Sequence, residues 1–311
     1  MKNFEKASLS AEEQLDLLIS RGLKVNNYKD ALHILKRNGY YHLSSYMRLF
    51  QEGDEHKFIK NIEFADIFTL ANFDRKLRLL TFDAIAQIEL SYRVAISNVL
   101  CKKDGSHWFY KIENFKSKEE QEKVIDLIKK QIHKSNKPEE YSETFIAKYY
   151  EKYDFPDLPP FWMIIETFTL GSLNILFNSL SNKNRKDIIK YLGFEDDITF
   201  IALNCNWLQS LSLVRNICAH HSRLFNRIFK IRPKRHKKII EFNIENTSSY
   251  YYIAMIINYY LSTINNDNSF GEVLNCLFEK YNYKVVMGFD ANWSKFTYTK
   301  KQKHFAVLEN K

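Results

Sequence analysis

The chain has 311 residues and a hydrophobic content of 45%, enough to bury a substantial core in one large domain or two smaller ones. Only 8 glycines and 5 prolines interrupt it, which favours long helices over a turn-rich β protein. A net charge of +9 points to a polyanionic partner, and four cysteines without a Cys-x-x-Cys pair argue against a zinc site or a disulfide framework.

The first hundred residues are predicted to be helical. Met1 to Lys6 has no signal-peptide pattern, and Ser10-Ala11-Glu12-Glu13 is typical of a helix N-terminus. The further elements expected here are helices at about 28–38, 40–51 and 61–100, with a short extended piece at 57–62. In the long helix, Glu89 and Arg93 are spaced i, i+4, which favours an intrahelical ion pair or a contact at the edge of the core over a catalytic role.

The rest of the chain continues the helical pattern. The charged span from Lys116 to Glu140 predicts a helix and a loop, and Pro156 to Pro160 marks a boundary before a helix from Trp162 to Phe177. Further helices are expected at about 183–192, 197–231, 249–264 and 270–280, with Pro233 ending the second of these. The most apolar run, Tyr250 to Ile264, is too short to span a bilayer, so we expect a cytoplasmic protein with no membrane association.

The helix predicted at 197–231 carries Arg215, Asn216 and His220. An arginine can hold a phosphate, and an imidazole titrates near neutral pH, so it can exchange protons with a ribose 2′-OH or a leaving oxygen. Cleaving RNA without a metal requires these two functions. We therefore interpret this segment as a catalytic site that needs no metal and no cofactor.

Helical phase separates the two adjacent histidines of this segment. At about 3.6 residues per turn, one stripe is polar and consists of Gln209, Ser212, Asn216, His220, Arg223 and Arg227. The opposite face is apolar and consists of Leu213, Val214, Ile217, Leu224, Phe225 and Ile228. His221 falls on the apolar face, which predicts a structural core histidine, whereas His220 projects with the polar residues and is the catalytic candidate.

Arg215 lies off this stripe, more than a quarter-turn from His220 on an ideal helix. Either the helix is distorted at the motif, or the arginine and histidine that cooperate come from different chains.

A run of basic residues begins within the motif helix and contains no acidic residue. Its members are Arg223, Arg227, Lys230, Arg232, Lys234, Arg235, Lys237 and Lys238. One interpretation is a solvated basic tail. We prefer a surface that binds RNA phosphates and delivers the strand to the adjacent motif.

Arg215 to His220 resembles the R-x4-6-H motif of HEPN ribonucleases, in which two motifs face each other across a dimer axis. Further blocks are 38–46, 73–78, 88–93, 160–162 with Glu166 and 170–173, and 215–226. Their order and spacing over roughly residues 15 to 230 resemble the Abi abortive-infection family of the AbiD/AbiF type. Members are bacterial anti-phage proteins of HEPN type, and some are similar to toxins paired with a small noncoding RNA. Family members often have a tryptophan where this chain has Phe225, an exchange that keeps an aromatic ring.

The elements and the resemblance together predict a mainly all-α protein, a HEPN-type helical bundle with extra helices at both ends and a minor β element. The expected regions are an N-terminal helical region at 1–60, a HEPN-like domain at 61–232 with an insertion at about 103–155, and a basic, partly helical extension at 233–311.

The resemblance implies an anti-phage endoribonuclease that acts as a homodimer. Arg215 would bind the phosphate, Asn216 would orient the histidine or the phosphate, and His220 would transfer the proton. The main alternative is a protein that binds a small noncoding RNA without cleaving it. A subunit controlled by a phage component is a third possibility, although no sequence feature identifies such a partner.

Overall fold

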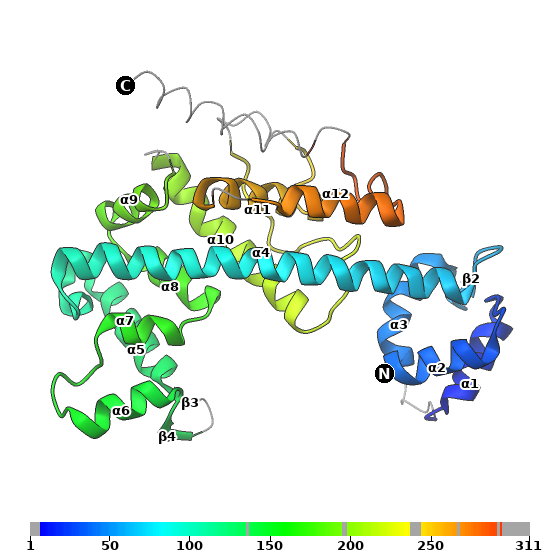
Figure 1. Cartoon of the computed structure of the whole chain (residues 1–311), viewed down its shortest axis with the longest axis horizontal. Helices are drawn as coiled ribbons and strands as arrows, with labels where there is room; N and C mark the ends of the chain where they lie inside the picture. The colour runs from blue at the N-terminus through cyan, green and yellow to red at the C-terminus, as the bar shows by residue number, and fades with distance from the viewer. Residues whose placement is uncertain are drawn as a thin grey trace. The chain divides into compact units, whose positions relative to one another are not determined.

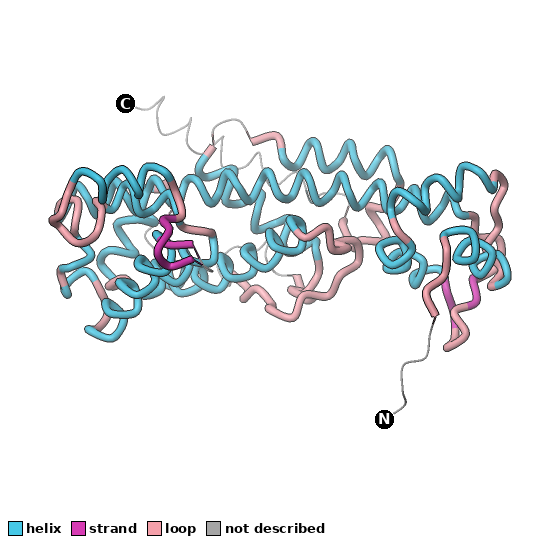
Figure 2. Tube along the Cα trace, turned by 90° about the horizontal axis from the view of Figure 1, so that it is seen from below, coloured by secondary structure: helices cyan, strands magenta, loops and turns pink. Residues whose placement is uncertain are grey.

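The computed structural model describes residues 7–134, 137–194, 198–236, 244–265, 268–290 and 293. The fold is mainly α-helical, with two small antiparallel hairpins, which confirms the predicted fold class (Figure 2). The chain packs as two compact units. Unit 1 comprises Met1–Leu79 and His221–Phe225, and unit 2 comprises Leu80–His220 and Asn226–Lys311. The expected regions 1–60, 61–232 and 233–311 stay predictions.

Unit 1 is built from short helices, a hairpin and the first part of a long helix. Its elements are α1 (Ala11–Ser20), α2 (Tyr28–Asn38), α3 (Tyr40–Met47), η1 (Arg48–Phe50), β1 (Gln51–Glu52), β2 (Lys57–Phe58) and the start of α4 (Phe64–Asp104) (Figure 1). Leu15, Leu18, Leu35 and Leu43 are buried, and each lies on the face that its helix turns inward. The predicted helix at 28–38 has the same bounds as α2.

The N-terminus of α1 is closed by the capping pair that the sequence indicates. The Ser10 hydroxyl accepts a hydrogen bond from the Glu13 backbone N–H at 3.2 Å, and the Glu13 carboxylate accepts one from the Ser10 N–H at 2.7 Å. These bonds satisfy two backbone donors that would otherwise have no partner within the helix.

Replacing Ser10 with alanine is therefore expected to lower the free energy of unfolding by about 0.5–2 kcal/mol. Urea unfolding of the full chain measures this change. Ser20→Ala is a matched control at the other end of the same helix, because the Ser20 hydroxyl only donates to the Leu17 carbonyl at 2.8 Å. Equal losses in the two variants would contradict the capping role.

Unit 2 contains the remaining part of α4 and most of the other helices. Its other elements are η2 (Trp108–Tyr110), η3 (Ile112–Asn114), α5 (Lys118–Ile132), β3 (His133–Lys134), β4 (Lys137–Tyr141), α6 (Thr144–Lys152), α7 (Phe161–Ile164), η4 (Ile165–Thr167), α8 (Leu170–Ser179), α9 (Asn182–Tyr191), α10 (Ile198–Ala219), α11 (Tyr250–Ile264) and α12 (Phe270–Tyr281).

One predicted helix of unit 2 is interrupted. The helix expected from Trp162 to Phe177 is split into α7, η4 and α8, because Thr169 has an extended backbone and its hydroxyl caps α8 by accepting the Ser172 N–H at 3.2 Å. The prediction of one continuous helix there is therefore wrong.

A buried polar residue of α10 connects three helices of unit 2. The Asn204 side-chain carbonyl accepts hydrogen bonds from the hydroxyls of Tyr92 in α4, at 2.5 Å, and of Tyr260 in α11. Burial raises the pKa of both phenols well above the ordinary value, so both remain donors. The most apolar run of the sequence forms α11, which is buried along most of its length. Among the described helices, none has the length and apolar character needed to cross a membrane.

Candidate functional site

The motif helix is shorter than the sequence predicts. α10 ends at Ala219, so the expected helix at 197–231 is wrong at its C-terminal end. The His220 N–H still bonds to the Asn216 carbonyl at 2.9 Å, but His221 takes a left-handed backbone conformation with φ 55°. Such a conformation ends a right-handed helix. His220 is thus the first residue beyond the helix.

This early end also corrects the assignment of His221. The side chain of His221 is exposed, and the structure does not support a core histidine at this position. The predicted helical phase fails because the backbone leaves helical geometry at His221 itself. On the expected apolar face, Leu224 and Phe225 are buried as part of a loop, whereas Leu213 is only half-buried and Ile228 is 75% exposed.

Within the described part of unit 2, the Arg215 guanidinium interacts with the side chains of Glu89, Phe82 and Asn216. Its Nε lies 4.0 Å from a carboxylate oxygen of Glu89, and its guanidinium carbon lies 5.5 Å from the centre of the Phe82 ring. An Nη of Arg215 also donates to the Asn216 side-chain carbonyl at 3.4 Å. A carboxylate, a ring face and an amide therefore restrict the guanidinium, while 31% of the Arg215 side chain stays exposed.

Glu89 lies next to Arg215, although its sequence pattern predicts only an ion pair or a core-edge contact with Arg93. Its ion pair with Arg93, at 2.6 Å, confirms the predicted i, i+4 contact. Its second oxygen, however, faces Arg215 of α10. Glu89 is only 7% exposed, and its carboxylate lies between the guanidiniums of Arg93 and Arg215. These two positive charges compensate the burial of its negative charge. Its presence in a family-like block, 88–93, was the only sequence signal for this role.

Arg93 holds this carboxylate from the other side. It donates to the Phe168 backbone carbonyl at 2.5 Å and lies 3.9 Å from the Glu166 carboxylate. Arg93 thus joins Glu166 to the Glu89 carboxylate, and both glutamates belong to family-like blocks. Arg93 therefore anchors Glu89, and Glu89 in turn contacts Arg215.

Three side chains of the motif are at least partly accessible. Asn216 and His220 are exposed, and Arg215 is half-buried. An exposed imidazole and a partly exposed guanidinium, five positions apart in the chain, can meet a ligand from solvent. The structure thus brings together the sequence-predicted Arg215 and Asn216, with His220 following at the end of the same helix.

Side chains of the predicted basic run are mostly at the surface. Lys230, Arg232, Lys234 and Arg235 are exposed, and Arg223 and Arg227 are half-buried. The two remaining members, Lys237 and Lys238, lie outside the described residues. The run does not continue the motif helix, and from 232 to 236 it has no regular secondary structure.

The main chain of the basic run is fixed at Lys234. Its N–H donates to the Asn206 side chain at 2.6 Å, and its carbonyl accepts from the Trp207 indole at 2.8 Å and from the Tyr252 hydroxyl at 3.2 Å. The Lys234 side chain is exposed beside this fixed backbone, and the Arg235 guanidinium donates to the Glu245 carbonyl at 2.8 Å. The predicted phosphate-binding role stays a prediction.

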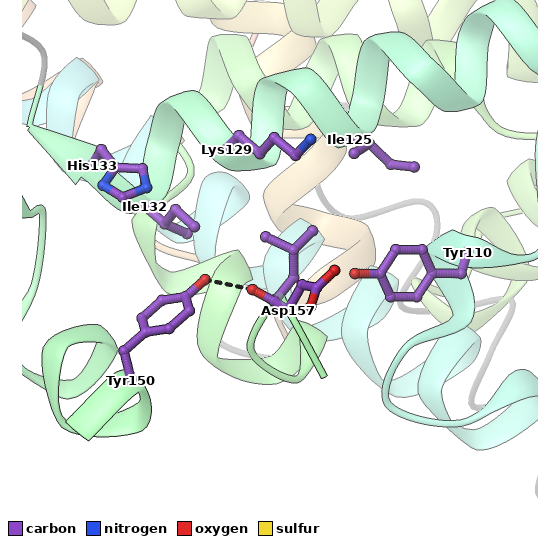
Figure 3. A pocket seen from close by; sticks show the side chains of 8 residues that line it. Tyr110, Ile125, Lys129, Ile132, His133, Tyr150 and Asp157 are labelled. Atoms are coloured by element: carbon purple, nitrogen blue, oxygen red, sulfur yellow. Dashed lines mark hydrogen bonds between the residues drawn. The ribbon is translucent and has the colours of Figure 1, made fainter. Parts of the chain in front are cut away.

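Two cavities of about 340 Å³ lie within unit 2. One is lined by residues of η2, α5, β3 and α6 together with Asp157 and Leu158, and it contains no residue of the predicted site (Figure 3). Around it, the Tyr150 hydroxyl donates to the Asp157 backbone carbonyl at 2.9 Å. The other cavity is lined by Asn226 and Arg227 with the N-terminal residues of α11.

No group of three or more His, Cys, Asp or Glu side chains suited to hold a metal ion occurs in the described part of the chain. The expected absence of a metal and a cofactor stays a prediction.

Comparison with known proteins assigns the sequence to a family. A family model described as Abi-like protein matches residues 33–226, which is more than half of the chain. The chain belongs to the Abi-like family. No curated protein and no solved structure matches it.

The predicted resemblance to the Abi family is therefore confirmed, and membership associates this Abi-like chain with abortive infection. The matched range contains Glu89, Arg215, Asn216 and His220, whereas the basic run from Arg227 onward lies beyond it. The HEPN relationship and the AbiD/AbiF type stay predictions.

Proposed function

We propose that this Abi-like protein is a metal-independent endoribonuclease that acts in abortive infection. The observation that supports it best is the environment of Arg215. A buried carboxylate and an aromatic ring restrict its guanidinium, part of the side chain reaches solvent, and His220 follows at the end of the same helix. A restricted cation and an accessible imidazole at the same helix end supply the two kinds of group that phosphodiester cleavage needs.

In the proposed reaction, the ribose 2′-oxygen attacks the adjacent phosphorus and loses its proton to a base. The bond from phosphorus to the 5′-oxygen breaks, and that oxygen gains a proton. The products are a 2′,3′-cyclic phosphate and a 5′-OH. His220 serves as the base or the acid, Arg215 stabilises the charge on the phosphate, and Asn216 orients one of these groups.

A homodimer supplies the second half of the site in this proposal, because each chain carries one motif and transfer of two protons is easier with two imidazoles. Arg223, Arg227 and the exposed basic residues that follow bind the RNA backbone and guide the strand.

A non-catalytic function is the second candidate. The exposed basic residues around the fixed Lys234 backbone suit a protein that holds a small noncoding RNA in a defence complex. In that case the basic residues would matter for function and His220 would not.

Incubating the purified protein with single-stranded RNA in excess EDTA tests the proposal. We expect cleavage to continue, because no step uses a metal ion, and we expect the products to carry 2′,3′-cyclic phosphate and 5′-OH ends. Enzymatic end-labelling of the products identifies these ends. Activity that is lost in EDTA and restored by magnesium, with the circular dichroism unchanged, would contradict the proposal. RNA binding without any cleavage would favour the second candidate.

A further inference from the structure

Asp74 of α4 is a fully buried carboxylate in unit 1 whose two oxygens hold different parts of the chain. Its Oδ2 accepts from the Tyr46 hydroxyl at 2.7 Å and forms an ion pair with Arg78. Its Oδ1 accepts from the backbone N–H of Phe225 at 2.6 Å and of Leu224 at 3.1 Å. One carboxylate therefore links α3 and α4 to the loop that follows the motif helix.

Two backbone N–H groups of the loop 221–225 donate to this carboxylate. In a continued helix, the N–H groups of Leu224 and Phe225 would bond to the carbonyls four residues earlier. Here both donate to Asp74 instead, and hydrogen bonds to a charged acceptor are stronger than those to a neutral carbonyl. His221, the first residue of this segment, and Asn226, the residue that follows it, have φ values of 55° and 47°, which non-glycine residues seldom adopt.

Side-chain packing also restrains the loop 221–225. Leu224 is fully buried, and the Phe225 ring meets the Phe73 ring edge to face at a centroid distance of 5.9 Å. Arg78 also donates to the Tyr46 hydroxyl at 2.8 Å, so the Oδ2 side of Asp74 is itself fixed. The Asp74 carboxylate cannot turn away from the loop without losing these contacts.

We propose that Asp74 is a positioning residue for the motif. It sets where α10 ends by capturing the N–H groups of Leu224 and Phe225, and it thereby restricts the backbone to which His220 is joined. Its effect on catalysis rests on the proposed ribonuclease function, whereas its effect on the loop does not.

Amide hydrogen exchange of the full chain tests whether Asp74 restrains the loop. In Asp74→Asn, a neutral amide oxygen replaces the charged acceptor, so we expect the amides of Leu224 and Phe225 to exchange about 10-fold faster, the factor that corresponds to the difference between a hydrogen bond to a charged group and one to a neutral group. Tyr46→Phe is the matched control, because it removes a donor to Oδ2 and leaves the Oδ1 contacts in place. Unchanged exchange of both amides in Asp74→Asn would overturn the proposal.

RNA cleavage at a temperature well below unfolding tests the catalytic consequence. In Asp74→Asn we expect kcat to fall about 10²-fold with little change in KM, because the catalytic group is misplaced while RNA binding remains. Tyr46→Phe is expected to keep kcat. Faster exchange in Asp74→Asn with an unchanged kcat would overturn the positioning role.

A second variant covers the case in which Asp74→Asn does not fold. Asp74→Asn combined with Arg78→Gln leaves no unpaired buried charge, and the same exchange and kinetic results are expected of it. If the wild-type protein cleaves no RNA, the proposed function fails, and hydrogen exchange alone decides whether Asp74 holds the loop.

Discussion

Replacing His220 with alanine is expected to reduce RNA cleavage by about 10²- to 10⁴-fold, the usual contribution of a general acid or base. The imidazole is exposed, and the hydrogen bond that His220 makes to the Asn216 carbonyl comes from its backbone N–H, which alanine keeps. We therefore expect the free energy of unfolding to change by less than about 0.5 kcal/mol. RNA affinity, measured by a gel shift, should stay close to that of the wild type.

His221→Ala is the matched control for this prediction. The two histidines are adjacent and both are exposed, so their truncation removes similar surface. We expect His221→Ala to retain cleavage and to unfold close to the wild-type midpoint. If both variants lose cleavage equally, the assignment of His220 as the proton-transfer group is wrong. Full cleavage by His220→Ala would favour the RNA-holding function.

Replacing Arg215 with alanine is expected to reduce cleavage by about 10²- to 10³-fold, the typical effect of removing one group that stabilises charge in the transition state. The fold should tolerate the change, because the buried Glu89 carboxylate keeps its ion pair with Arg93 at 2.6 Å. Cleavage rates and urea unfolding of the same preparation separate the two effects.

Arg93→Ala provides the comparison, since both arginines contact the same carboxylate. Losing Arg93 removes the close ion pair and the hydrogen bond to the Phe168 carbonyl. We expect a loss of about 1–3 kcal/mol in the free energy of unfolding, as for other hydrogen bonds to charged groups. A destabilised Arg215→Ala variant beside a stable Arg93→Ala variant would contradict this division of roles.

Regular helices of this fold could be predicted because local signals determine them. The Ser10 cap and the period of apolar residues in 28–38 lie within the elements that they specify. The end of α10 has no such local signal. The next helix breaker after the motif is Pro233, whereas the helix ends at Ala219, and the N–H groups of Leu224 and Phe225 beyond it donate to Asp74, far away in the sequence.

Some residues of the candidate site could also be predicted from local sequence, whereas others depend on tertiary packing. Residue type and spacing were enough to select Arg215, Asn216 and His220. The i, i+4 spacing also predicted the pair of Glu89 with Arg93, but the approach of Glu89 to Arg215 depends on how α4 packs against α10 within unit 2. No pattern within a single helix reports such a contact.

The fixed main chain at Lys234 has a consequence for how a polyanion would bind. Three hydrogen bonds hold this backbone before any ligand binds: the Lys234 N–H donates to Asn206, and the Lys234 carbonyl accepts from Trp207 and Tyr252. Ordering a flexible segment on binding costs conformational entropy, and a segment that is already ordered avoids much of that cost. The main chain of this basic segment is therefore already ordered at Lys234, so a polyanion that bound there would order less of the protein backbone.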